Sequence, residues 1–281
     1  MVFQSSILKV REHGSSLESH DTSVLNNNIP NNVDVGGTSG NVSFTEKTDK
    51  LVSYVVSGSN RRIYADWQQG DIQTTPGTGG DIDALELIFK PKQSQATQVL
   101  VQSSGSGGSI PKTLWDLQLQ PSGSTQPLKA RLQFRLNERD NGVGTDNKFF
   151  SGSTDYFDMM NGNFWNVLIQ RTSPGKVGNS HRPDASNNNL SQSYQLIVGE
   201  KHNEKIRKLQ SVTLNLTEGT NGSVAAKSAH SNWVGTGSRP AGTRGNLTIG
   251  YAFTGSIAEV RAWKYPLSAS VFKQHILDPK K

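Results

Sequence analysis

The chain has 281 residues, 33% of them hydrophobic, and a formal net charge of +6 with no cysteine. That length accommodates one large domain, and the missing cysteine excludes disulfides, thiol catalysis and cysteine metal ligands. The basic residues are scattered, so the charge predicts a solvated surface and no specific nucleic-acid site, and no apolar run is long enough to span or insert into a membrane.

The first 40 residues differ in character from the remainder. Val2–Val10 is a short candidate strand, and Asn26–Asn32 has linker composition because Asn tolerates left-handed backbone. We therefore divide the chain into an N-terminal strand and linker segment, residues 1–40, and a strand-rich domain, residues 41–281. The abrupt start also suggests a piece of a longer protein.

Apolar and polar residues alternate with period two through much of the domain, which predicts antiparallel strands. Leu51–Val56 and Arg61–Trp67 are expected to form a hairpin. Trp115–Gln120 is expected to pair with Ala130–Asn137 across a turn that contains prolines and a glycine. Along the second of these strands one face is predicted to carry Leu132, Phe134 and Leu136, and the other Arg131, Gln133 and Arg135.

The C-terminal segment 246–278 predicts two strands and a short helix. The strand 255–263 has apolar residues on both faces, with Ile257 expected beside Arg261 and Trp263, and such a strand is usually central in its sheet. Ser268 is expected to cap the helix. The apolar side of that helix is predicted to comprise Val271, Phe272, Ile276 and Leu277, and His275 is interpreted as a surface or packing residue.

Four motifs in order resemble concanavalin A-like, laminin-G-like jelly rolls. The segment 255–268 is similar to that family's "G-x-I-x-E-V-R-x-W … L-S" ending, and 84–91 to its "E-x-W/I-F-K-P" strand. Residues 161–171 resemble "D-G-x-W-H-x-V-x-x-R", with Asn161 for Asp and Asn166 for His, and 194–201 resemble "Y-x-L-Y-V-D-G-K". The resemblance implies an all-β fold, a two-sheet antiparallel jelly-roll sandwich with a short C-terminal helix.

Relatives of this fold include glycoside hydrolases with an "E-x-D-x-x-E" carboxylate cluster on one strand. The nearest approach here is Glu138-Arg139-Asp140, and Val143 stands at the third acidic position. A retaining mechanism needs two carboxyl groups about 5–5.5 Å apart. We therefore predict no catalytic residues and no enzyme activity, and a glycoside hydrolase is kept as the alternative.

Calcium-binding relatives of this fold use oxygen-rich loops at the sheet rim, since hard cations prefer oxygen ligands. The candidate metal residues are Asp140, Asp146, Asp155 and Asp158, with Asp81 and Asp83 as a further pair. Because Asp and Asn beside Gly are also ordinary turn residues, the main expectation is no cofactor. A structural calcium ion is left open.

A ligand-binding loop would expose an aromatic ring. Trp233, with Asn232 before it, is the candidate, because its surroundings are polar. Trp115 opens a strand and is expected in the core, and the family resemblance implies core positions for Trp165 and Trp263. The alternative is that Trp233 folds back as a loop anchor.

The resulting functional prediction is a non-enzymatic binding or structural module of a larger assembly. Its overall resemblance is to modules of tailed-phage virion proteins, with a bacterial cell-surface or secreted location as the alternative. The expected partners are other subunits or a glycan, and a calcium-dependent lectin is a second alternative.

Overall fold

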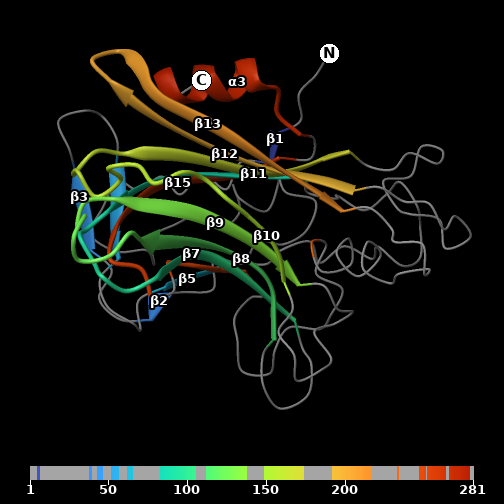
Figure 1. Cartoon of the computed structure of the whole chain (residues 1–281), viewed down its shortest axis with the longest axis horizontal. Coiled ribbons are helices and arrows are strands. Elements are labelled where there is room, and N and C mark those ends of the chain that lie inside the picture. The colour runs from blue at the N-terminus through green and yellow to red at the C-terminus, as the bar shows by residue number, and fades with distance from the viewer. Residues whose placement is uncertain are drawn as a thin grey trace, which may run out of the picture.

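The computed structural model describes residues 5–6, 38–39, 43–46, 52–56, 62–65, 83–105, 112–137, 149–173, 192–216, 233, 247–250, 252–263 and 266–278. Within these ranges the strands form two antiparallel sheets, one of eight strands and one of seven, stacked face to face (Figure 1). The C-terminal helix α3 (Ala269–Leu277) lies on the outer side of the eight-stranded sheet. This confirms the predicted all-β sandwich with a short C-terminal helix. None of the described helical residues forms a helix long and apolar enough to cross a bilayer.

The eight-stranded sheet has the order β13-β12-β11-β6-β15-β4-β3, and β1 also pairs with β15. Its strands are β1 (Ser5–Ser6), β3 (Ser43–Glu46), β4 (Val52–Val56), β6 (Ala84–Pro91), β11 (Trp165–Ser173), β12 (Gln192–His202), β13 (Lys205–Leu216) and β15 (Gly255–Trp263).

The seven-stranded sheet has the order β10-β9-β8-β7-β14-β5-β2. Its strands are β2 (Thr38–Ser39), β5 (Arg62–Ala65), β7 (Gln98–Gly105), β8 (Lys112–Pro121), β9 (Ala130–Asn137), β10 (Phe149–Ser153) and β14 (Leu247–Ile249). The predicted pairing of 115–120 with 130–137 is confirmed as β8 and β9, with Trp115 opposite Leu136.

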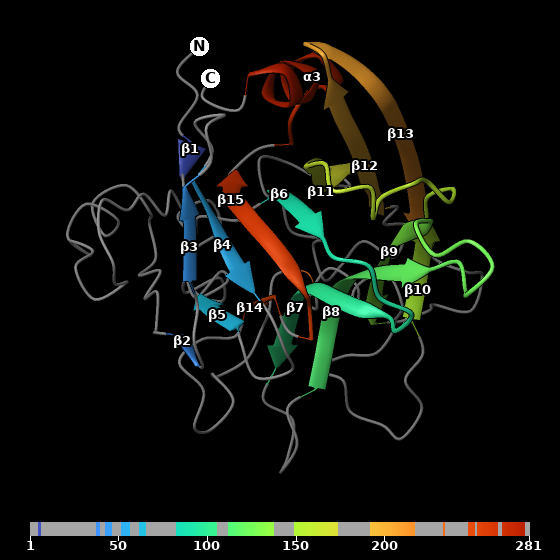
Figure 2. The same ribbon diagram turned by 90° about the vertical axis from the view of Figure 1, so that its left-hand side faces the viewer.

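The last two strands complete both sheets. β15 lies between β6 and β4, and β14 lies between β7 and β5 (Figure 2). The predicted central position of 255–263 is therefore confirmed. One detail differs from the prediction. A bulge between Ile257 and Val260 places one extra residue of β15 opposite β6, so the residues that follow it change faces. Ile257 joins the core with Val260, and does not share the outer face with Arg261.

The predicted hairpin of 51–56 and 61–67 is wrong. β4 pairs with β3 and β15 in the eight-stranded sheet, whereas β5 pairs with β14 and β2 in the other sheet. The connection therefore crosses between layers. Alternation reports which residues of a strand face the core, and it does not report which sheet the strand joins.

The core between the sheets is built from the inward residues of each strand. Its centre is aromatic: Trp115, Phe134, Tyr194 and Trp233 form a cluster with ring centroids 5.3–6.3 Å apart. All four rings are buried. Such large side chains each bury a large apolar area and contribute strongly to the stability of the core.

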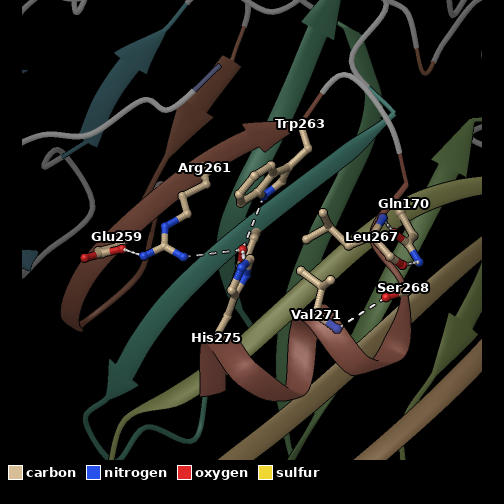
Figure 3. A network of polar contacts seen from close by, with 9 residues as sticks. Gln170, Glu259, Arg261, Trp263, Leu267, Ser268, Val271 and His275 are labelled. Atoms are coloured by element: carbon tan, nitrogen blue, oxygen red, sulfur yellow. Dashed lines mark hydrogen bonds and ion pairs between the residues drawn. The ribbon is translucent and has the colours of Figure 1, made fainter. Parts of the chain in front are cut away.

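A buried polar network attaches α3 to the sheet beneath it (Figure 3). The Nδ1 of His275 lies 2.9 Å from one oxygen of Glu86 and 3.1 Å from the other. Trp263 donates its indole N–H to the same carboxylate at 3.2 Å and stacks on the His275 ring at 5.3 Å. Since a carboxylate only accepts, Nδ1 carries the proton. His275 is thus a packing residue with a specific partner.

The start of α3 is held by a second set of contacts. Ser268 accepts a hydrogen bond from the Val271 amide at 3.3 Å, which confirms the predicted cap. Gln170 accepts from the Leu267 amide at 2.8 Å and donates to the Leu267 carbonyl at 3.2 Å. The buried apolar side of α3 is narrower than predicted, because the Leu277 side chain is 37% exposed.

Candidate functional site

The outward face of the seven-stranded sheet carries a continuous set of polar side chains, which we call the polar ladder. It consists of Gln102, Thr113, Asp116, Gln118, Gln120, Arg131, Gln133 and Arg135. The pairing of β8 with β9 sets three rungs opposite one another: Asp116 with Arg135, Gln118 with Gln133, and Gln120 with Arg131. Because the alternate residues of both strands fill the core, these side chains all point away from it.

One rung is an ion pair. Arg135 donates from Nε to Asp116 Oδ1 at 2.8 Å and from Nη2 to Oδ2 at 2.5 Å. The Asp116 side chain is 3% exposed and the Arg135 side chain 28%. The hydrogen bond to Asp116 raises the pKa of Arg135, against the opposing effect of burial. Two parallel charge-assisted hydrogen bonds fix the guanidinium plane on the sheet.

The side chains of the other two rungs form a chain of hydrogen bonds that runs from Arg131 through Gln120 and Gln118 to Asp116. Gln120 donates from Nε2 to Gln118 at 3.2 Å and to Gln133 at 2.6 Å. Its Oε1 then accepts from Arg131 Nε at 3.0 Å. Gln118 in turn donates to Asp116 at 3.2 Å. Each amide orientation is therefore determined by its neighbours. Asp116 and Gln118 are buried, and the half-buried members Gln120, Arg131, Gln133 and Arg135 present preoriented donors and acceptors.

Two aromatic rings lie at the ends of the ladder. The Arg135 guanidinium is 4.6 Å from the centroid of Phe149, and the Arg131 guanidinium is 5.2 Å from that of Tyr156. Tyr156 is 41% exposed. An exposed ring beside fixed polar groups offers an apolar surface and hydrogen-bonding groups to the same ligand.

The carboxylate chemistry of this face does not match a retaining glycosidase. On the described strands of the face, Asp116 is the one carboxylate, and it is bound by Arg135. Acid and nucleophile require two such groups about 5–5.5 Å apart. The residues considered for such a pair in the sequence, Glu138 and Asp140, lie outside the described ranges.

The structure places the predicted ligand-binding residue Trp233 in the core. Its ring has no exposed surface and stacks on Trp115 at 5.3 Å, with Tyr194 edge-on at 5.7 Å. This corrects the ligand-contact expectation in favour of the loop-anchor alternative, because a ring covered on all sides cannot stack on a ligand. Asn232 lies outside the described residues.

Among the described residues, the predicted metal ligands are not grouped into a metal site. Asp155 and Asp158 are exposed residues of the segment between β10 and β11, and Asp140 and Asp146 fall outside the described ranges. Asp83 is buried and paired with Arg171. Within the described part of the chain no three acidic, histidine or cysteine side chains are grouped as a metal site. Calcium binding stays a prediction.

The ladder was not predicted as a site. The sequence signal was present as Gln-x-Gln on β8 and Arg-x-Gln-x-Arg on β9, and it was used only to orient the strands. Polar side chains at every second position of a strand ordinarily indicate a solvated face of the sheet. What distinguishes this one is the cross-strand register that joins its side chains into one network.

Neither a protein-family profile nor a curated protein matches the sequence. Solved structures with some likeness include the binding domain of Paraclostridial Mosquitocidal Protein 1, with TM-score 0.41 and 11% identity over 98% of this chain and 51% of that chain. Another is botulinum neurotoxin type C, described as entering cells through two ganglioside molecules, with TM-score 0.41 and 9% identity over 87% and 46%.

A third is the CBM40 of the Ruminococcus gnavus IT-sialidase, with TM-score 0.35 and 14% identity over 76% of this chain and 95% of that chain. This chain aligns with only about half the length of the first two structures. At these identities and TM-scores the likeness assigns no function.

Proposed function

We propose that the chain is a non-enzymatic glycan-binding module whose binding surface is the polar ladder. The observation that carries this proposal is the hydrogen-bonded array of amides, one carboxylate and two guanidinium groups across β8 and β9. Its members are fixed by one another, so little side-chain freedom is lost when a ligand binds.

Sugars fit such a surface because each hydroxyl both donates and accepts a hydrogen bond. Amide oxygens supply acceptors, and amide and guanidinium N–H groups supply donors. The apolar face of a pyranose packs against an aromatic ring, and Tyr156 presents one at the end of the ladder. Groups of this kind bind and orient a glycan without cleaving it.

The proposed setting is a larger assembly, either a tailed-phage virion or a bacterial cell surface. The support is the sequence resemblance to jelly-roll modules of such proteins, on the motifs at 84–91, 161–171, 194–201 and 255–268. In this setting the sandwich is a rigid support for the ladder, and the partners are glycans and neighbouring subunits. The genes beside the coding sequence test it, since a location among polysaccharide-degradation genes contradicts the virion role.

A glycan array followed by calorimetry on the best ligand tests the binding function. We expect Gln133→Ala to weaken that ligand about 2- to 10-fold, the effect of losing one hydrogen bond. Thr213→Ala, at an exposed position of β13 on the other sheet, is the matched control and keeps wild-type affinity.

Three results would overturn the proposal. One is the absence of any glycan ligand for the folded chain, and another is equal binding by Gln133→Ala and wild type. The third is the release of new reducing ends from the bound glycan, which would identify an enzyme. Repeating the titration with a chelator tests the calcium-dependent alternative.

A further inference from the structure

The two arginines of the polar ladder differ in how their charge is balanced. Arg135 is neutralised by two hydrogen bonds to Asp116. Arg131 uses its Nε to donate to Gln120, a neutral amide, and it forms no ion pair with a carboxylate among the described residues. Its outer donors are therefore a guanidinium fork with an unbalanced positive charge, on a half-buried side chain.

The surroundings of Arg131 hold it in place. The backbones of Ala130 and Phe157 exchange two hydrogen bonds of 2.9 Å, which bring the segment after β10 beside the start of β9. This pairing sets the Tyr156 ring under the guanidinium at 5.2 Å. Gln120 fixes the other edge of the guanidinium plane. Arg131 and Tyr156 thus form a platform held from both sides, on which Tyr156 is 41% exposed and Arg131 is half-buried.

The carboxylates nearest in sequence are not paired with Arg131. Asp155 immediately precedes Tyr156 and Asp158 follows it by two residues, and neither forms an ion pair with Arg131. Lys129, two residues before Arg131, adds positive charge to the same end of the face. An anionic group that approaches the platform therefore meets a cation already oriented to bind it.

We infer that the Arg131–Tyr156 platform selects sugars that carry a carboxylate, such as uronic or sialic acids, with the carboxylate on Arg131 and the apolar sugar face on Tyr156. This inference rests on the proposed glycan binding and specifies its ligand class. A planar guanidinium matches a carboxylate with two parallel hydrogen bonds, which a neutral hydroxymethyl group cannot replace.

The test uses two matched pairs of probes: oligogalacturonate with its carboxyl-reduced form, and sialyllactose with lactose. We expect the chain to bind at least one acidic probe about 10-fold or more tightly than its neutral counterpart, with affinity falling as salt is raised. Arg131→Gln should remove that preference, so that the acidic and neutral members of each pair bind with similar affinity. Lys208→Gln removes the same charge from an exposed site on β13, and it should keep the preference for the acidic probe.

The outcomes separate the two proposals. Equal affinity for the acidic and neutral members of both pairs overturns the acidic preference and leaves glycan binding standing. A preference retained by Arg131→Gln assigns the carboxylate to another site and overturns the role of Arg131. If a broad glycan array also shows no ligand, the proposed function itself fails. Which acidic probe binds distinguishes uronate from sialic acid.

Discussion

Arg171 and Asp83 form a fully buried ion pair. Arg171 donates from Nε to Asp83 at 3.0 Å, and both side chains are at most 2% exposed. The backbones of the same two residues are also joined, with Arg171 N donating to Asp83 O at 2.8 Å. Removing either partner would leave an uncompensated buried charge, which costs about 3–5 kcal/mol.

Tyr194 lies close enough to this pair to be affected by it. Burial raises the pKa of its hydroxyl, Arg171 lowers it and Asp83 raises it, with burial the largest cause. The unfolded chain has a tyrosine pKa of about 10. Below that pH both states keep the proton, and above it the unfolded state alone loses it. The stability associated with this group is therefore complete below about pH 10 and is lost as pH rises toward the folded pKa.

Replacing Tyr194 by Phe should make stability less sensitive to alkaline pH. We expect the fall in the free energy of unfolding above pH 10 to be shallower in Tyr194→Phe than in wild type, by up to about 1.4 kcal/mol per pH unit. Urea unfolding at pH 8, 9, 10 and 11 measures both slopes. Tyr156→Phe, at an exposed ring, is the matched control. Parallel slopes for wild type and Tyr194→Phe would contradict the assignment.

Two features at the residue scale could not be predicted from the sequence: the packing of Trp233 and the polar network on β8 and β9. The polar neighbours of Trp233 indicated a surface loop, yet the ring packs on Trp115, more than 100 positions earlier in the chain. The polar side chains of β8 and β9 were oriented correctly, but their register was needed to join them into a network. Both features depend on contacts distant in sequence, and local periodicity contains no information about such contacts.

At the scale of elements, β15 and α3 were the most predictable parts, and their details depended on partners. Apolar residues on both faces correctly indicated a central strand, while the bulge that turns Ile257 inward had no local signal. Ser268 correctly marked the beginning of the helix. The attachment of that helix through Glu86, 189 positions before His275, required the fold.

The packing of α3 on β12 leaves no room at Gly199. A Cβ atom there would lie 2.3 Å from Ile276 Cδ1 and 3.3 Å from Leu209 Cδ1. We expect Gly199→Ala to lower the free energy of unfolding by about 1–3 kcal/mol, the usual cost of overpacking. Denaturant unfolding measures the change.

A second substitution tests the cause. Ile276→Val removes the Cδ1 atom and should cost about 0.5–1.5 kcal/mol by itself. In the Gly199→Ala, Ile276→Val pair the 2.3 Å contact is gone and the remaining close contacts are 3.3 Å, so the pair should lose less stability than the sum of the two single changes. Strictly additive losses would mean that Gly199 is needed for another reason.

At the scale of the whole molecule, the two sheets are joined by the order in which the chain visits them. Within the described residues, β3, β4 and β6 lie in one sheet and β2, β5 and β7 in the other. The last strands then insert between these early ones, β14 between β5 and β7 and β15 between β4 and β6. Neither sheet is continuous until the C-terminal strands are in place, so folding depends on contacts far apart in sequence.

Two shortened chains separate the contribution of these strands from that of the helix. Residues 1–265 keep β14 and β15 but lose α3, which uncovers the small apolar cluster of Ala84, Leu168 and Ile197 and leaves Glu86 without His275. We expect this chain to retain strand-type circular dichroism and cooperative melting at a lower Tm. Residues 1–245 lose both central strands, so both sheets are broken into separate parts with unpaired edges and β1 loses its partner.

We expect the chain of residues 1–245 to show no cooperative melting and to bind dyes that recognise exposed apolar surface. Adding the peptide 246–281 in excess should restore part of the native spectrum, because β14 and β15 can pair with the four strands that flank their sites. A peptide with Ile257 and Val260 both changed to Asp is the matched control, since it places charge in the core. Cooperative melting of residues 1–245 without the peptide would show that the early strands form a stable sandwich by themselves.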